Sequence, residues 1–256
     1  MKFPTSKDKG NFMRFYVSPD SIFLLENIAE IKDKTEIHHI RDVMRLKKGD
    51  RVDIFDGSGR EFSGVMEDTG KGSVIIKIKE KPALKKGTSL NVTLYQAIPK
   101  KTKMDFIVEK AVELGVSRIV PMITERTVPD IKDFSGKIAR WKRISVSGAK
   151  QSGRSTLPGI SDAMYFDNAL AESKQNDLVI FASLDKGSIP LKDILRGCSP
   201  SKTAVFIGPE GDFSPTESAM ARNSGYCGMC SLGGLVLRSE TAAIYLLSCL
   251  AYEFQH

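Results

Sequence analysis

AVFIGPEGDFSPTE, at residues 204–217, contains an apolar run of strand length, a glycine-bearing turn and the start of a helix, in that order. An uninterrupted apolar strand is typical of a parallel sheet whose two faces are both covered by helices. Ser214, Pro215 and Glu217 supply an N-cap, a proline at the first helical position and a carboxylate two residues later, and Gly225 marks a helix end. The stretch therefore predicts a strand–loop–helix unit of an α/β domain.

The same alternation continues on both sides of this unit. Further strands are expected at 91–98, 117–123, 178–182 and 226–232, and helices at 102–114, 135–150 and 239–254. Thr102 and Asp105 resemble a capping box at the start of the first of these helices. The apolar middle of the last helix predicts burial against the sheet or against another subunit.

The first third of the chain has a different pattern. Short strands are expected at 14–17, 51–55, 61–67 and 73–79, with glycine-bearing turns between them and one short helix near 38–44. The segment KPALKKG (residues 81–87) then interrupts the pattern with proline, glycine and charge. We therefore expect an all-β barrel or sandwich module over 1–82, followed by an α/β domain over 83–256.

The basic residues are concentrated in the middle of the chain. The formal net charge is +7, and residues 89–160 carry 13 basic and 6 acidic side chains, with no Asp or Glu between 134 and 161. Such a surplus favours contact with a polyanion such as RNA. The alternative is a solvated basic helix face with no ligand.

Cysteines and glycines exclude several classes of protein. Four Cys in 256 residues do not form a disulfide scaffold, and no segment resembles an export signal or a membrane span, so we expect a reduced, cytoplasmic protein. Cys227 and Cys230 form a CxxC without a second ligand pair, so we expect core cysteines and no metal. The two glycine-bearing loops match neither a dinucleotide fingerprint nor a P-loop.

Several motifs together resemble one known family. They are KMDFIVEKAVELGV (103–116), TERT (124–127), QSGR (151–154), IGPEG (207–211) and LRSETAA (237–243), with RFYV (14–17), HHI (38–40) and FDG (55–57) nearer the start. In order and spacing they resemble the RsmE family, the bacterial 16S ribosomal RNA uridine-N3 methyltransferases of the SPOUT superfamily. The resemblance covers nearly the whole chain.

This resemblance implies a fold, a cofactor and partners. It implies an N-terminal PUA-like barrel that binds RNA, a C-terminal α/β domain with a trefoil knot, a homodimer, and methylation of N3 of a uridine in 16S ribosomal RNA of the small ribosomal subunit with S-adenosylmethionine as donor. The cofactor would contact Leu184, Ile207, Gly208, Pro209, Glu210, Gly211, Ser231, Leu232, Gly233, Val236, Leu237 and Arg238.

The chemistry needs an anion-stabilising group, because the proton on N3 of uracil must be lost and negative charge spreads to the ring oxygens. Our hypothesis gives this role to Arg238, with Glu210 or Glu240 orienting donors or accepting the proton. The residues expected to contact RNA phosphates are Arg14, Arg41, Arg45, Lys103, Arg126, Arg143 and Arg154.

Three positions depart from the pattern of the family, and two alternative functions stay open. Lys150 stands where Glu is common, Asp212 where a further Gly is usual, and Leu235 where Arg is frequent. Asp212 and Leu235 fall within the expected cofactor loops and affect the details of the pocket. The alternatives are an RNA-binding or ribosome-assembly protein without catalysis, and a related enzyme that methylates the ribose 2′-oxygen.

Overall fold

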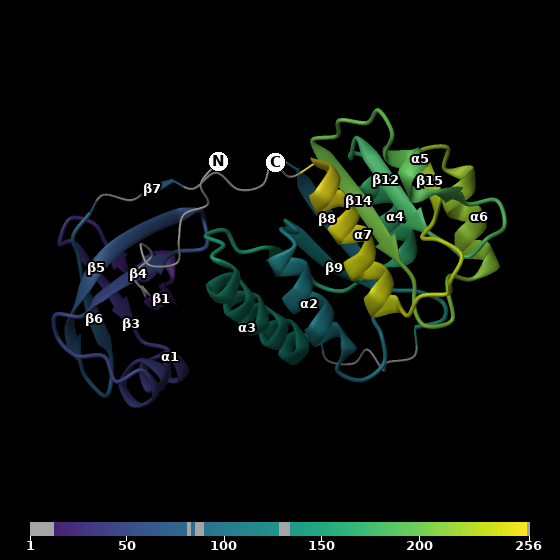
Figure 1. Cartoon of the computed structure of the whole chain (residues 1–256). Helices are drawn as coiled ribbons and strands as arrows, with labels where there is room; N and C mark the ends of the chain where they lie inside the picture. The colour runs from purple at the N-terminus through teal and green to yellow at the C-terminus, as the bar shows by residue number, and fades with distance from the viewer. Residues whose placement is uncertain (1–12, 81–82, 85–89, 128–133, 255–256) are drawn as a thin grey trace. The chain divides into compact units, whose positions relative to one another are not determined.

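The computed structural model describes residues 13–80, 83–84, 90–127 and 134–254 (Figure 1). The chain forms two compact units, one of residues 1–87 with 153–156 and one of residues 88–152 with 157–256. Strand β7 (Ala83–Leu84) pairs with β5 (Arg60–Thr69) of the first unit, so this unit continues beyond the expected boundary at 82/83. Most of the KPALKKG segment lies outside the described residues.

The first unit is built on one sheet. Its strands follow the order β1 (Met13–Tyr16), β4 (Arg51–Phe55), β5, β6 (Val74–Ile78), β3 (Ile28–Ile31) and β2 (Ile22–Phe23). β1 and β4 are parallel, and the other neighbours are antiparallel. A short 3-10 helix η1 (Pro19–Ser21), the helix α1 (Lys34–His38) and a π-helical turn η2 (His39–Val43) complete it. Apolar side chains that alternate along these strands form its core.

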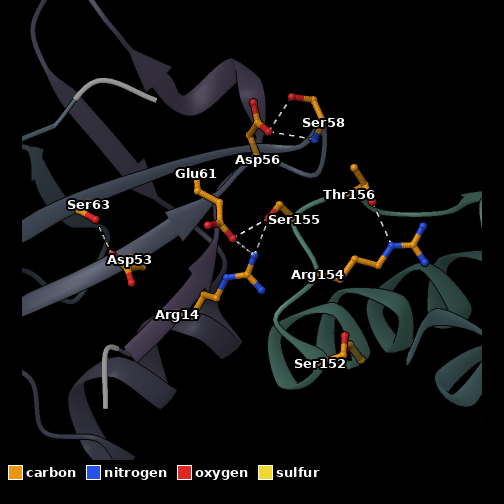
Figure 2. Close-up of polar contacts among 11 residues, drawn as sticks. Arg14, Asp53, Asp56, Ser58, Glu61, Ser63, Ser152, Arg154, Ser155 and Thr156 are labelled. Atoms are coloured by element: carbon orange, nitrogen blue, oxygen red, sulfur yellow. Dashed lines mark hydrogen bonds and ion pairs between the residues drawn. The ribbon is translucent and has the colours of Figure 1, made fainter. Parts of the chain in front are cut away.

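Residues 153–156 join this first unit through polar contacts (Figure 2). The Ser155 hydroxyl donates to Oε1 of Glu61 at 2.6 Å and accepts from Nη2 of Arg14 at 3.1 Å. The Gly59 amide donates to the Ser155 carbonyl at 3.1 Å. The Arg14 guanidinium also lies 4.2 Å from the ring centre of the buried Phe55, so this partly buried arginine packs against the interior of the unit.

The second unit has a sheet in which every pairing is parallel. The order is β10 (Gly159–Ile160), β9 (Arg118–Ile123), β8 (Asn91–Ala97), β14 (Lys202–Ile207), β12 (Leu178–Ala182), β15 (Cys227–Ser231) and β13 (Ile189–Pro190), with β11 (Met164–Tyr165) also on β9. The predicted parallel α/β sheet is confirmed.

Helices cover both faces of this sheet. One face packs against α2 (Lys103–Glu113), α3 (Ser135–Ser152), α5 (Leu191–Leu195) and α7 (Ser239–Phe254), and the other against α4 (Phe166–Ser173) and α6 (Pro215–Asn223). Figure 1 shows α7 lying beside α2 across β8 and β14. Along β12, Ile180 belongs to the first layer, and Val179 and Phe181 belong to the second. This burial on both faces explains the uninterrupted apolar runs.

The predicted N-cap at Ser214 and the predicted capping box at Thr102 have different outcomes. Ser214 accepts from the Glu217 amide at 3.2 Å, so the predicted N-cap of α6 is confirmed, and the Glu217 carboxylate accepts from the Ser214 amide at 2.8 Å, which completes a capping box. The box at Thr102 is wrong, because the Thr102 side chain makes no capping hydrogen bond. The Thr102 backbone has ψ of 9°, outside the extended region of an N-cap, and Asp105 instead pairs with Arg140 at 2.7 Å.

Candidate functional site

Three loops meet at the carboxyl edge of the second sheet. Because β14, β12 and β15 are neighbours, the loops that follow them lie together, which is where ligands bind in open α/β sheets. They enclose a pocket of about 290 Å³. Its lining residues are Ala182, Ser183, Leu184, Asp185, Ile207, Gly208, Pro209, Glu210, Asp212, Ser231, Leu232, Gly233, Gly234, Leu235, Val236, Leu237, Ser239 and Ala242.

The start of α7 fixes one wall of this pocket. The Ser239 hydroxyl donates to the Gly208 carbonyl at 2.6 Å and accepts from Nε2 of Gln96 at 2.9 Å. Gln96 is completely buried at the end of β8, and its Nε2 also donates to the Ala97 carbonyl. A chain of hydrogen bonds therefore connects β8, α7 and the loop after β14, and it holds the Gly208 carbonyl in one position.

The loop after β14 folds back through a tight turn. The Asp212 amide donates to the Pro209 carbonyl at 3.1 Å, and Asp212 has a φ of +59°. A Cβ on Gly208 would lie 3.0 Å from the buried Phe213 ring, so a larger residue at this position would require this ring to shift by a few tenths of an ångström. Glycine at 208 thus allows the turn to close beside the pocket.

A cluster of charges made by Lys103, Glu210 and Glu240 borders the pocket. The Lys103 ammonium lies 3.1 Å from Oε1 of Glu210 and 3.4 Å from Oε2 of Glu240, and the Lys100 amide donates to Oε1 of Glu210 at 3.2 Å. Burial alone would raise the pKa of Glu210, but its hydrogen bonds and Lys103 outweigh this and hold the pKa below its usual value. The hydrogen bond to Glu210 raises the pKa of Lys103. This pair therefore stays ionised at neutral pH.

The structure brings together most of the residues expected to bind the cofactor. Those in the lining are Leu184, Ile207, Gly208, Pro209, Glu210, Ser231, Leu232, Gly233, Val236 and Leu237. Gly211 and Arg238 are outside it. The Gly211 carbonyl points to Arg126, which donates to it from Nη1 at 2.6 Å. Arg238 is exposed just before α7.

Other lining residues were missed by the motif comparison. Asp185 follows the apolar run of β12 by three residues, so the rule that ligands bind at strand ends could have found it. Its Oδ2 pairs with Nη2 of Arg222 at 2.8 Å. Ser239 carries no such signal, because its role depends on Gly208 and Gln96, which are distant in the sequence.

The structure divides the expected RNA-contacting residues into two groups. Arg45 and Arg143 are exposed and Arg41 is partly exposed. The other four, Arg14, Lys103, Arg126 and Arg154, make contacts within the chain. Burial lowers the pKa of Arg154 to about 10, and its Nε donates to the Thr156 hydroxyl at 3.0 Å.

The CxxC cysteines lie in the second sheet. Cys230 is buried in β15, and burial raises the pKa of its thiol to about 12, which keeps it protonated and unreactive. Within the described ranges, no three His, Cys, Asp or Glu side chains are grouped so that they could hold a metal ion. No helix in the same part of the chain combines the length and apolar character that crossing a membrane requires.

Models of two protein families match the chain. The RNA methyltransferase domain matches residues 86–251, and the RNA methyltransferase PUA domain matches residues 31–79. The first match contains all three pocket loops. The second covers much of the sheet of the first unit.

Individual relatives agree with these matches. The ribosomal RNA small subunit methyltransferase E of Rickettsia conorii is 31% identical, over 84% of this chain and 86% of the relative. The structure of the Neisseria gonorrhoeae enzyme of the same name, bound to S-adenosylmethionine, has a TM-score of 0.82 at 27% identity, covering 94% of this chain and 98% of that one. A Legionella pneumophila protein in complex with the same cofactor has a TM-score of 0.85 at 29% identity, covering 95% and 98%. This chain therefore belongs to the ribosomal RNA small subunit methyltransferase E family of RNA methyltransferases.

Proposed function

We propose that the protein transfers the methyl group of S-adenosylmethionine to N3 of a uridine in 16S ribosomal RNA of the small ribosomal subunit. The observation that carries this proposal is the pocket at the carboxyl edge of the second sheet, formed by three loops within the segment that matches the RNA methyltransferase domain. The name of the relatives supports ribosomal RNA as the substrate. The choice of uridine N3 rests on the motifs.

The pocket has the composition that this cofactor requires. Leu184, Ile207, Leu232 and Leu237 offer apolar contact for a nucleoside, and the backbone groups of Gly208 and its neighbours can form directed hydrogen bonds. Three carboxylates in the lining suit a ligand with a positive charge. When it is bound, the sulfonium supplies an electrophilic methyl group. The volume of about 290 Å³ is at the lower end of the usual range for ligand pockets.

Arg238 is suited to act on the RNA substrate. Its guanidinium is exposed beside the pocket loops and makes no hydrogen bond or ion pair within the described residues. It can donate to a uracil oxygen or to a phosphate as negative charge develops. Glu210, in contrast, is held by Lys103 and has a lowered pKa, which makes it a weak proton acceptor. We therefore give Glu210 an orienting role and keep Glu240 as the candidate proton acceptor.

The proposal extends to assembly, topology and location. Tyr245 and Tyr252 expose 45% and 84% of their surface on α7, beside a second pocket that includes Leu191 and Leu195, and this apolar face supports a homodimer. The trefoil knot is proposed from the resemblance to the RsmE family. Action on ribosomal RNA supports a cytoplasmic location.

The test uses purified protein, S-adenosylmethionine with a labelled methyl group, and small ribosomal subunits from a strain without the corresponding gene. Nuclease digestion and mass spectrometry identify the modified nucleoside. We expect labelled 3-methyluridine, and comparison with free 16S RNA shows which form is the substrate. A 2′-O-methyl nucleoside would indicate the ribose-modifying alternative. Failure to bind S-adenosylmethionine in titration calorimetry would indicate an RNA-binding protein without catalysis.

A further inference from the structure

The pocket contains one carboxylate that lacks a positively charged partner. Of the three acidic side chains in its lining, Asp185 pairs with Arg222 at 2.8 Å and Glu210 pairs with Lys103 at 3.1 Å. Asp212 forms no ion pair in the part of the chain that the structure describes. Among these residues, its Oδ2 accepts a hydrogen bond from the Leu184 amide alone, at 3.2 Å. Within the described residues, therefore, no basic side chain neutralises the negative charge of Asp212.

The backbone places this carboxylate between two pocket loops. At φ of +59°, Asp212 is in the left-handed region, which Asp and Asn tolerate better than most side chains. Its Oδ1 lies 3.4 Å from the site of a Cβ on Gly208, and its Oδ2 contacts the amide of Leu184. The side chain thus spans from the loop after β14 to the loop after β12, and both Gly208 and Leu184 line the pocket.

We propose that Asp212 makes the pocket prefer the positively charged sulfonium of S-adenosylmethionine over the neutral thioether of the product S-adenosylhomocysteine. This inference rests on the proposed function. The two compounds differ by one methyl group and one positive charge. An unpaired carboxylate in a partly enclosed pocket interacts with a cation more strongly than it would in bulk water. Loss of the methyl group removes this attraction, so Asp212 favours exchange of the product for a new cofactor molecule.

The experiment measures dissociation constants by titration calorimetry for three compounds. S-adenosylmethionine carries the sulfonium, sinefungin carries an ammonium in its place, and S-adenosylhomocysteine carries neither. Asp212→Asn removes the charge, keeps an acceptor for the Leu184 amide and tolerates the positive φ. We expect this substitution to lower the affinity for both charged compounds about five- to tenfold and the affinity for the neutral compound less than about twofold.

Two further variants separate charge from shape. Asp212→Gly relieves the strain of the positive φ but removes the contact with Leu184. We therefore expect it to lower the affinity for all three compounds and also to lower the preference for the two charged ones. Asp162→Asn removes the same charge from an exposed position outside the pocket, and it should leave all three constants unchanged. Thermal unfolding of each variant shows that it is folded.

Each result has one interpretation. Asp212→Asn could lower the affinities for charged and neutral compounds equally, or lower none of them. In either case the preference does not come from Asp212, and the inference is overturned while the proposed cofactor stands. If the unaltered protein binds none of the three compounds, the proposed function itself fails, and the inference fails with it. A lowered ratio of affinities in Asp212→Asn, with Asp162→Asn unchanged, supports the inference.

Discussion

The shape of the pocket wall depends on Gly208. A Cβ at this position would lie 3.0 Å from the Phe213 ring, and Phe213 cannot move easily because its ring centre is 4.2 Å from that of Phe181. Gly208→Ala should therefore lower affinity for S-adenosylmethionine at least about tenfold and the free energy of unfolding by about 1–3 kcal/mol. Calorimetry and urea denaturation measure the two effects.

Gly211→Ala is the matched control for this substitution. Its Cβ would meet only Arg126 Cδ at 3.7 Å, an ordinary contact, so both quantities should change little. Equal effects of the two substitutions would show that the close approach to Phe213 does not determine the shape of the pocket.

Substitution of Arg238 tests the methyl-transfer step separately from cofactor binding. Its side chain is exposed and outside the pocket lining, so Arg238→Ala should leave the dissociation constant for S-adenosylmethionine within about twofold. Turnover should fall at least about tenfold, because a donor to the developing anion is lost. Single-turnover methylation of small subunits gives the rate. An unchanged rate would remove Arg238 from the mechanism.

Asp56 is expected to make the free energy of unfolding depend on pH, and this dependence can be measured without cofactor or RNA. Burial would raise the pKa of this carboxyl, but hydrogen bonds from Ser58 and the nearby Arg60 outweigh burial and lower it. A lowered pKa contributes stability above the pKa of the unfolded chain, about 3.9, and this contribution is lost as the pH falls through the native pKa. Asp56→Asn should cost about 1–3 kcal/mol at neutral pH. Urea denaturation should show the difference from the unaltered protein shrinking below about pH 4.

The motifs predicted most of the pocket but not the contacts that hold it. Ile207 and Leu232 were predictable because loops at the ends of parallel strands gather at one edge, whereas Leu184 was expected from the family resemblance. The buried chain from Gln96 through Ser239 was not, because it joins positions 143 residues apart and no local pattern encodes it.

Among the helices, α6 and α2 show why a capping pattern alone does not determine a cap. Ser214 and Thr102 stand in the same pattern, but only Ser214 has the extended backbone that lets its side chain reach an amide. Ser214→Ala should lower the free energy of unfolding by about 1 kcal/mol. Thr102→Ala should change it by less than about 0.5 kcal/mol. Equal losses in urea denaturation would contradict the difference in backbone geometry.

The order of the strands in the second sheet depends on the fold of the whole unit and was only partly predictable from the sequence. The apolar runs of β12 and β14 indicated parallel strands buried on both faces, which is confirmed. The position of β14 between β8 and β12 was not predictable, because it depends on a chain path in which strands adjacent in sequence are not adjacent in the sheet. The short strand β13 and helix α5 were missed because neither is long enough to show a period.

The basic surplus in the middle of the chain favoured a polyanionic partner such as RNA, but it did not distinguish the arginines that are available to RNA. Arg143 is exposed on α3, whereas Arg154 is largely buried, and only an exposed guanidinium can neutralise a phosphate without unfolding. Arg143→Ala should lower the slope of log affinity against log salt by about 1 for a 16S RNA fragment, measured by fluorescence anisotropy. Arg154→Ala should instead lower the free energy of unfolding and leave the slope unchanged. If Arg143→Ala leaves the slope unchanged, α3 does not contact RNA phosphates through this residue.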